Sequence, residues 1–307
     1  MAPVWREPLM IILLACILTV VADMPAAAPA RIETALLPAL RIDGQNARAH
    51  TQGLEVIGNE YYVTARLEQV PRKALLLRTS VGATDWEVWD ITPRQTDGAP
   101  TAMDHPGGLQ SDGKHLWIPL AESVPGGCSR IQVYPLDRFV PGVAAVPEFE
   151  FAVDDHIGAL AVSAGQERVF GASWDTAAVY IWDFVGQLRR TLTGDDLRAR
   201  RLGIVNTTPR DAGVAVQDWK VAGKFLFGSG LVAEPSAEGK ARSRLIIWEH
   251  FLETTPEVVI HPLPWGENRE LAREGMALSE GWVYFLPEDL SGTNYLYKTP
   301  LGRFLGR

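Results

Sequence analysis

Three of the six histidines in the sequence occupy one recurring position, four residues before a leucine, in segments that align without a gap. They are His50, His105 and His156, which precede Leu54, Leu109 and Leu160. Three neutral imidazoles can bind a divalent transition metal and leave one coordination position for water, whose pKa the metal lowers toward neutrality. The pattern therefore predicts one divalent metal ion as cofactor, held by these three histidines.

The position two residues before the same anchor carries larger polar side chains elsewhere in the chain. In two further copies of the pattern, Trp219 and Met276 stand in the place of the leucine. Gln52, Gln217 and Glu274 occupy the second position before their anchors, and glycine occupies it in the other two copies. Glu274 is the candidate for moving a proton in catalysis, and the two glutamines are candidates for binding and orienting a ligand.

A structural role is the alternative for the histidines. Repeats of common ancestry keep one residue type at one position, and imidazole nitrogens can hydrogen-bond a neighbouring repeat and hold it in place. Histidine-rich clusters of this kind also arise without a metal. The sequence leaves both interpretations open.

A second polar set follows the second predicted strand of several repeats. It comprises Arg66, Glu122, Trp174, Asp175, Glu288 and Asp289. Glu122, Asp175 and Glu288 are predicted to bind ligand at the rim of a central channel. The alternative for such positions is hydrogen bonding within turns or between neighbouring repeats.

The elements that must position these residues are short strands in five repeated units. The anchors are Leu54, Leu109, Leu160, Trp219 and Met276, and successive anchors are separated by 55, 51, 59 and 57 residues. In the first unit, β-rich runs at 54–57, 61–65, 74–78 and 86–91 are separated by Gly, Pro and Asp turns. This organisation predicts an all-β chain, a β-propeller with five four-stranded blades.

In such a fold, residues at the same position of each repeat lie close together in space, because the inner strands of all blades converge on a central channel. Side chains alternate along a strand, so the positions two and four before each anchor are expected to share its face. Ring closure needs a strand that pairs the last blade with the start of the chain. The segment 32–42 is predicted to supply the outer strand of the last blade.

Residues 1–30 have the features of an export signal. Arg6 precedes an apolar run that extends to Val21, and small residues suitable for cleavage end at Ala30. The run is too short for a stable membrane-spanning helix.

Residues 13–16 loosely resemble a lipoprotein box, but the apolar run continues beyond Cys16, which favours simple cleavage over lipid anchoring. A single propeller domain at 31–307, periplasmic or secreted and without a stable membrane span, is predicted.

Charge and cysteine content limit the partners and the means of stabilisation. The net charge is −8 with 21% charged residues, which argues against a nucleic-acid partner because phosphate binding needs a basic surface. Removal of residues 1–30 leaves Cys128 as the one cysteine, so no intramolecular disulfide can form. A small polar ligand or another protein is the expected partner.

Several motifs carry a resemblance to a known family. They are His50-Thr51-Gln52-Gly53, Asp104-His105-Pro106-Gly107-Gly108, Trp117-Ile118-Pro119-Leu120-Ala121-Glu122, Asp155-His156-Ile157-Gly158 and Tyr284-Phe285-Leu286-Pro287-Glu288-Asp289. Over nearly all of the chain after residue 30, the sequence resembles the uncharacterised bacterial domain-of-unknown-function 6454 family. The resemblance implies an exported propeller-like protein and brings no assigned reaction.

A second resemblance is local. The segment 51–54 is similar to the signature of plant-type glutaminyl cyclotransferases, which are five-bladed propellers that form pyroglutamate. In those enzymes a catalytic glutamate follows the next strand in a Glu-Ser-Thr-Gly segment, whereas this chain has Val63-Thr64-Ala65-Arg66. The resemblance therefore does not extend to the catalytic group.

Together these features predict an exported propeller that holds a metal or a small polar ligand in its axial funnel. Metal-assisted hydrolysis or lyase chemistry is the leading functional hypothesis. A non-enzymatic module for protein interaction or ligand sensing is the alternative, and the fold alone does not choose between them.

Overall fold

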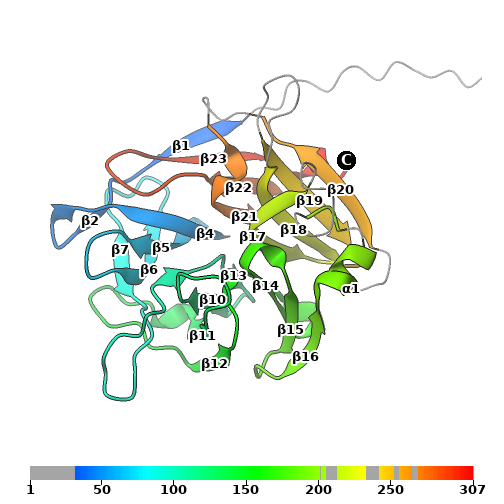
Figure 1. The fold of residues 1–307 in the computed structure, drawn as a ribbon. Helices are drawn as coiled ribbons and strands as arrows, with labels where there is room; N and C mark the ends of the chain where they lie inside the picture. The colour runs from blue at the N-terminus through cyan, green and yellow to red at the C-terminus, as the bar shows by residue number, and fades with distance from the viewer. Residues whose placement is uncertain are drawn as a thin grey trace, which may run out of the picture. The chain divides into compact units, whose positions relative to one another are not determined.

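The computed structural model describes the part of the chain that follows the predicted export signal. The described residues are 32–200, 202–204, 213–232, 242–251, 256–264 and 269–306. The predicted signal at 1–30 lies outside them. Within the unit formed by residues 31–307, five small antiparallel sheets are arranged in a ring with their inner strands nearest its centre (Figure 1). The predicted five-bladed β-propeller is confirmed.

The blades follow one another along the chain. Blade 1 contains β4 (Ala49–Ile57), β5 (Glu60–Leu67), β6 (Lys73–Ser80) and β7 (Glu87–Asp90). Blade 2 contains β8 (His105–Pro106), β9 (Gln110–Ser111), β10 (His115–Ala121), β11 (Ser129–Pro135) and β12 (Phe149–Val153). Blade 3 contains β13 (Ile157–Ser163), β14 (Arg168–Ser173), β15 (Val179–Asp183) and β16 (Leu188–Leu192). Blade 4 contains β17 (Val214–Ala222), β18 (Phe225–Val232), β19 (Ser243–Glu249) and β20 (Glu257–Pro262). Blade 5 contains β21 (Gly275–Ser279), β22 (Trp282–Leu286) and β23 (Asn294–Pro300).

The N-terminal strand completes blade 5 and closes the ring. β1 (Glu33–Leu37) pairs antiparallel with β23, from Glu33 opposite Lys298 to Leu37 opposite Asn294. The predicted closure by the segment 32–42 is therefore confirmed. A small hairpin of β2 (Arg41–Ile42) and β3 (Gln45–Asn46) then leads into blade 1. Pairing the two ends of the domain covers the edge of β23 and ties the N-terminal segment to the last blade.

The hydrophobic core is divided among the five interfaces between neighbouring blades. Each of the five apolar clusters combines residues of two adjacent blades. Each cluster contains one of the five anchors, and every anchor is at most 1% exposed: Leu54, Leu109, Leu160, Trp219 and Met276. The anchors recur because each blade must bury one large apolar side chain against the blade before it.

A β-bulge recurs in the inner strands just before the anchor. The pairing register shifts between Thr51 and Gly53 in blade 1, and equivalent shifts occur at the same template position in blades 3 and 4. In blade 1, His50 lies opposite Arg66 and Leu54 lies opposite Val63. Arg66 and Val63 are three residues apart on the regular strand β5, so they point to opposite faces.

The expectation that the histidines share the face of their anchors is therefore wrong. The bulge adds one residue to the inner strand and breaks the alternation of side chains, which re-aims the residues before it. As a result His50 faces the axial funnel while Leu54 packs between blades. No signal in the local sequence pattern distinguished this arrangement from a regular strand.

Candidate functional site

Two neighbouring cavities at the start of the inner strands form an axial funnel. The larger has a volume of 370 Å³, and its walls include seven of the predicted site residues: His50, Gln52, His105, His156, Asp175, Gln217 and Glu274. The second, of 330 Å³, shares His50, Arg273 and Glu274 with the first and also contains Glu288 and Asp289. The repeat positions thus converge, as the propeller architecture requires. Of the predicted residues, Glu122 is absent from both walls.

The base of the funnel is blocked on the axis by Asp218. The residue just before the anchor is glycine in blades 1, 2 and 5, and the inner strands approach so closely that a Cβ on Gly53 would lie 2.8 Å from the Cα of Gly108. Asp218 takes this position in blade 4 and is fully buried. Its carboxylate accepts hydrogen bonds from the backbone N–H groups of Leu54, at 3.3 Å, and Met276, at 2.9 Å.

The axial carboxylate is compensated by a lysine of the same strand. Lys220 Nζ lies 2.6 Å from Asp218 Oδ1, and both side chains are at most 1% exposed. Burial raises the pKa of Asp218, and the Lys220 ammonium opposes this shift. Asp218 thereby ties the inner strands of blades 1, 4 and 5 together, which makes it a structural residue beneath the site.

His50 is oriented by a carboxylate. Its Nδ1 lies 2.6 Å from Asp289 Oδ1, which requires that Nδ1 carries the proton and leaves Nε2 as an acceptor in the neutral ring. Asp289 also accepts a hydrogen bond of 2.7 Å from Arg48. Burial opposes ionisation of Asp289, but the hydrogen bonds from His50 and Arg48 hold its pKa below the usual value. A histidine held by a carboxylate in this way has the geometry of a general base.

His105 has the opposite arrangement. Arg66 Nη1 lies 3.1 Å from His105 Nδ1, and a guanidinium can only donate, so Nδ1 is the acceptor and Nε2 carries the proton. Burial lowers the pKa of His105 to about 3, with further contributions from His156, Arg66 and His50. The neutral ring offers the funnel an N–H donor.

His156 offers an acceptor instead. Its Nδ1 lies 2.7 Å from the backbone carbonyl oxygen of Glu122, so Nδ1 donates and Nε2 is unprotonated in the neutral form. Burial lowers the pKa of this histidine, which is 2% exposed. Its ring centroid lies 5.4 Å from that of His105 and 4.6 Å from that of Trp174.

This arrangement does not support the predicted three-histidine metal site. His105 would have to bind a metal through Nε2, the nitrogen that carries its proton, because Arg66 occupies Nδ1. Within the described ranges no group of three or more His, Cys, Asp or Glu side chains is placed to hold a metal ion. The three rings reach one funnel, but their Nδ1 atoms contact three different partners, which are Asp289, Arg66 and the Glu122 carbonyl oxygen.

Glu274 is a buried carboxyl group that faces both cavities. It is 8% exposed, and burial raises its pKa to about 8, with a further contribution from the negative charge of Asp289. The adjacent Arg273 lies 3.9 Å away and opposes the shift. At neutral pH Glu274 is therefore mainly protonated and can donate a proton or a hydrogen bond to a ligand.

The three predicted rim residues lie in different surroundings. Asp175 lies in the funnel wall on a short 3-10 turn after β14, with a positive φ of 52°. Glu288 lines the second cavity, where it forms an ion pair with Arg269. Glu122 turns back to its own loop and accepts a hydrogen bond of 3.1 Å from the Cys128 backbone N–H. For Glu122 the alternative of hydrogen bonding within a turn fits the geometry.

Three further residues line the funnel, of which the sequence places Asp289 and Trp174 in the second polar set and gives Arg273 no role. Asp289 belongs to the second polar set, but its contact with His50 joins positions 239 residues apart. Arg273 and Trp174 each adjoin a predicted residue and line the larger cavity. Adjacency to Glu274 was the signal available for Arg273, and only the ring arrangement shows that all three side chains reach the funnel.

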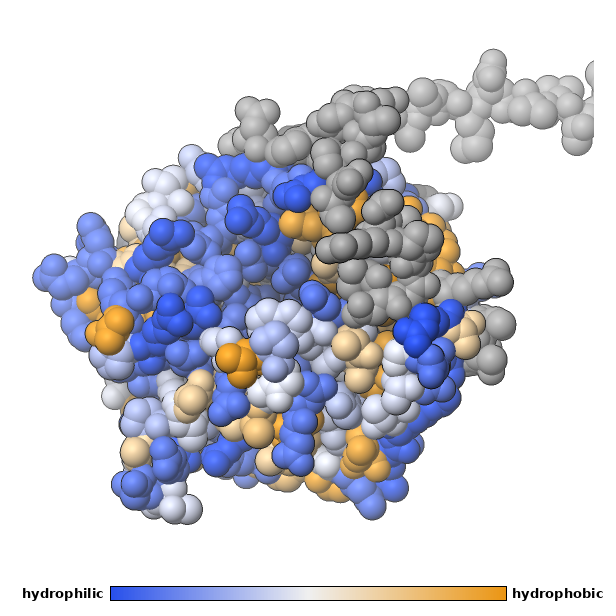
Figure 2. All heavy atoms as spheres, in the orientation of Figure 1, coloured by the Kyte–Doolittle hydropathy of each residue, from blue (hydrophilic) through white to orange (hydrophobic). Residues whose placement is uncertain are grey.

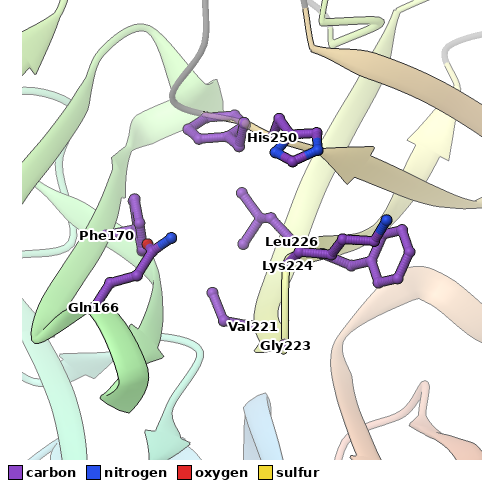
Figure 3. A pocket seen from close by; sticks show the side chains of 9 residues that line it. Gln166, Phe170, Val221, Gly223, Lys224, Leu226 and His250 are labelled. Carbon is purple, nitrogen blue, oxygen red and sulfur yellow. The ribbon is translucent and has the colours of Figure 1, made fainter.

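A further cavity, of 120 Å³, lies between blades 3 and 4 beside the turn that joins β17 to β18 (Figure 3). Phe170, Leu226 and Val221 form its apolar walls, and Gln166 and Lys224 lie at its edge. Lys224 forms an ion pair with Glu249. None of the predicted site residues lines this cavity, so the axial funnel remains the candidate site.

The fold and the funnel define a five-bladed β-propeller with titratable side chains gathered at one end of its axis. The chain belongs to the family described as "Family of unknown function (DUF6454)", whose sequence profile matches residues 32–242. No curated protein is significantly similar to it in sequence. These comparisons do not show the local similarity to glutaminyl cyclotransferases.

Several solved structures align with most of the chain. A GH43 endo-arabinanase from Bacillus licheniformis aligns over 84% of this chain and 96% of its own, with 11% identity and a TM-score of 0.44. A protein of unknown function from Bacteroides thetaiotaomicron aligns over 88% and 76%, with 9% identity and a TM-score of 0.46. The WD40 domain of Toxoplasma gondii coronin aligns over 86% and 75%, with 9% identity and a TM-score of 0.38. At these values the similarity carries no inference about activity.

The described helices include none that is long and apolar enough to cross a membrane. The one α-helix among them is α1 (Gly194–Ala199), of six residues.

Proposed function

We propose that the chain is a propeller enzyme that binds a small polar ligand in the axial funnel and acts on it by general acid–base catalysis. The observation that carries the proposal is the contrast between two groups that line the same two cavities. His50, whose Nδ1 is held by Asp289, offers Nε2 as an acceptor in the neutral ring, whereas buried Glu274 keeps its proton at neutral pH. When the environments of two titratable groups push their pKa values apart in this way, one group can act as the base and the other as the acid.

The chemistry follows from these roles. His50 Nε2 accepts a proton from a water molecule in a hydrolysis or from the substrate in an elimination, and Asp289 stabilises the imidazolium that forms. Glu274 donates its proton to the leaving group. His105 Nε2–H and His156 Nε2 supply one donor and one acceptor for orienting the ligand, as do the amides of Gln52 and Gln217. This scheme needs no metal bound by the histidines.

The test is a screen for turnover of small ester, glycoside and hydroxy-acid substrates, with the His50→Asn and Glu274→Gln variants. We expect each substitution to lower kcat by about 100-fold or more while the variants still fold, since positioned acid and base groups contribute roughly 10²–10⁴-fold each. His250→Asn is the matched control, because His250 lines the separate cavity between blades 3 and 4. Full activity in both funnel variants would overturn the proposal.

The alternative, a non-enzymatic interaction module, has support from one surface segment. Val140, Val143 and Val146 are 49%, 55% and 66% exposed in the connection between β11 and β12. On the face shown in Figure 2, by contrast, apolar residues are scattered among hydrophilic ones. Loss of function on changing these valines to serine, with funnel variants unaffected, would favour the interaction module.

Export belongs to the same proposal. The predicted signal at 1–30 supports export of the domain to the periplasm or the medium, where the funnel would meet extracellular ligands. N-terminal sequencing of the protein from cell fractions tests this. A mature start near Arg31 in an exported fraction is the expected result, and a cytoplasmic protein that retains residues 1–30 would contradict it.

A further inference from the structure

The rim of the funnel carries an exposed aromatic ring. Trp174 is 38% exposed, although large apolar side chains are normally buried. It lines the larger cavity, and its ring stands at 68° to that of His156 with a centroid separation of 4.6 Å. The turn that presents it is held in an uncommon conformation, because Asp175 and Thr176 both have positive φ angles, of 52° and 54°.

Such a ring is suited to a ligand with one apolar face. The axial C–H groups of a sugar ring form a face of this kind, and an indole covers it without needing a hydrogen bond. The walls beneath Trp174 are polar by contrast. Gln52 sits at the bulge of β4, outside the paired register, and Gln217 occupies the equivalent place in β17. Their amides and the two neutral histidines alternate donors and acceptors, which matches a set of hydroxyl groups.

The funnel also carries a cation that lacks an ionised partner at close range. The Arg273 side chain is 65% exposed, and the carboxyl group nearest to it is Glu274, at 3.9 Å. Glu274 is mainly protonated at neutral pH, so it does not neutralise the guanidinium. Among the described residues no other carboxylate lies within ion-pair distance of Arg273.

A guanidinium without an ionised partner can bind one carboxylate. Arginine binds carboxylates through two parallel hydrogen bonds, which leaves the proton of the neighbouring Glu274 for the leaving group. Both groups line the two cavities, on the side of the funnel where His50 is held by Asp289. Arg48, the other arginine of the second cavity, is paired with Asp289, so one cation remains for the ligand, and a single cation suits a monoanion better than a doubly charged phosphate.

We propose that the ligand of the funnel is a sugar acid, with its carboxylate bound by Arg273, its ring face against Trp174 and its hydroxyl groups on Gln52 and Gln217. The inference rests on the proposed function, in that it names the ligand class of the same site. It assigns binding roles to Arg273 and Trp174, and the acid–base roles stand without it.

The test compares an acid with the neutral sugar of the same ring. Binding of D-galacturonate and D-galactose to the chain from residue 31 is measured by isothermal titration calorimetry at pH 6.5. We expect galacturonate to bind at least about ten-fold more tightly, because a hydrogen bond to a charged group contributes roughly 1.5–3 kcal/mol. Arg273→Gln should abolish the preference, and Trp174→Ala should weaken both sugars. Arg168→Gln, at the far end of β14, is the matched control and should change neither.

Two results would overturn the inference. One is equal or absent binding of the two sugars, and the other is an unchanged preference in Arg273→Gln. Neither result contradicts the proposed acid–base function. That proposal is overturned only if the His50→Asn and Glu274→Gln variants both retain full turnover. The two proposals are therefore separable.

Discussion

The Asp218 carboxylate fills the space that the absent side chain of Gly108 leaves at the propeller axis. A Cβ on Gly108 would lie 2.3 Å from Asp218 Oδ1, well inside van der Waals contact. The carboxylate in turn accepts hydrogen bonds from the inner strands of blades 1 and 5. A glycine in blade 2 and an acid in blade 4 thus depend on each other, and the floor of the funnel depends on both.

Gly108→Ala should destabilise the whole ring. The added methyl group meets a buried, ion-paired carboxylate and the backbone of β17, neither of which can move freely, so we expect a loss of about 1–3 kcal/mol in the free energy of unfolding. Chemical denaturation measures this. Gly165→Ala is the matched control, because a Cβ there meets nothing within 4 Å. Equal stability of the two variants would show that the axis is less tightly packed than the contacts indicate.

The buried Glu274 should make stability depend on pH. Its pKa is 4.5 in the unfolded chain and about 8 in the folded protein, so between these values the folded state binds a proton that the unfolded state lacks. Stability therefore falls as pH rises from 4.5 to 8. Burial raises the pKa of Glu55 to about 8 as well, so it adds a loss in the same direction. Because His105 titrates near 6.5 when unfolded, the carboxyl groups are best examined above that pH.

Glu274→Gln should reduce this dependence. Between pH 6.5 and 8 each of the two carboxyl groups lowers the free energy of unfolding by at most about 2 kcal/mol. The substitution removes the contribution of Glu274 and leaves that of Glu55. Thermal unfolding at the two pH values measures the change, with the exposed Glu257→Gln as control. A slope identical to that of the unchanged protein would mean that Glu274 is ionised in the folded state.

Removal of the closing strand should destabilise all five blades together. Deletion of residues 31–43 removes β1 and opens the pairing with β23, which exposes a strand edge and part of the core between blades 5 and 1. We expect a large fall in melting temperature or loss of cooperative unfolding by circular dichroism. Leu36→Ser, at a side chain 69% exposed in the same strand, should leave the transition nearly unchanged. A deletion variant as stable as the intact domain would show that closure is dispensable.

Metal analysis checks the interpretation of the histidines. Protein purified without an affinity tag, and analysed by elemental mass spectrometry, should hold no stoichiometric transition metal, because Arg66 occupies Nδ1 of His105. Addition of zinc should not raise the melting temperature. Near-stoichiometric metal that is lost in the His50, His105 and His156 alanine variants would contradict this and restore the metal-assisted hypothesis.

Much of the fold follows from local patterns. The anchors Leu54, Leu109 and Leu160, with the strand signals around them, are enough to predict five blades, because each blade buries the same kind of residue against its neighbour. The segment 32–42 is recognisable as a closing strand because it is a β-rich run left over before the first complete unit. Convergence of the repeat positions on one funnel then follows from the ring.

The chemistry of the funnel could not be predicted without the tertiary structure. The bulges before the anchors of blades 1, 3 and 4 decide which side chains of those strands face the axis, and they lie where the inner strands approach closely around Gly53 and Gly108. Proton positions on His50 and His105 depend on Asp289 and Arg66, which lie on other strands. The sequence by itself determined the architecture and the residues that gather at the axis. Only the packed ring decided their directions, partners and protonation, because desolvation and hydrogen bonding act between segments far apart in the chain.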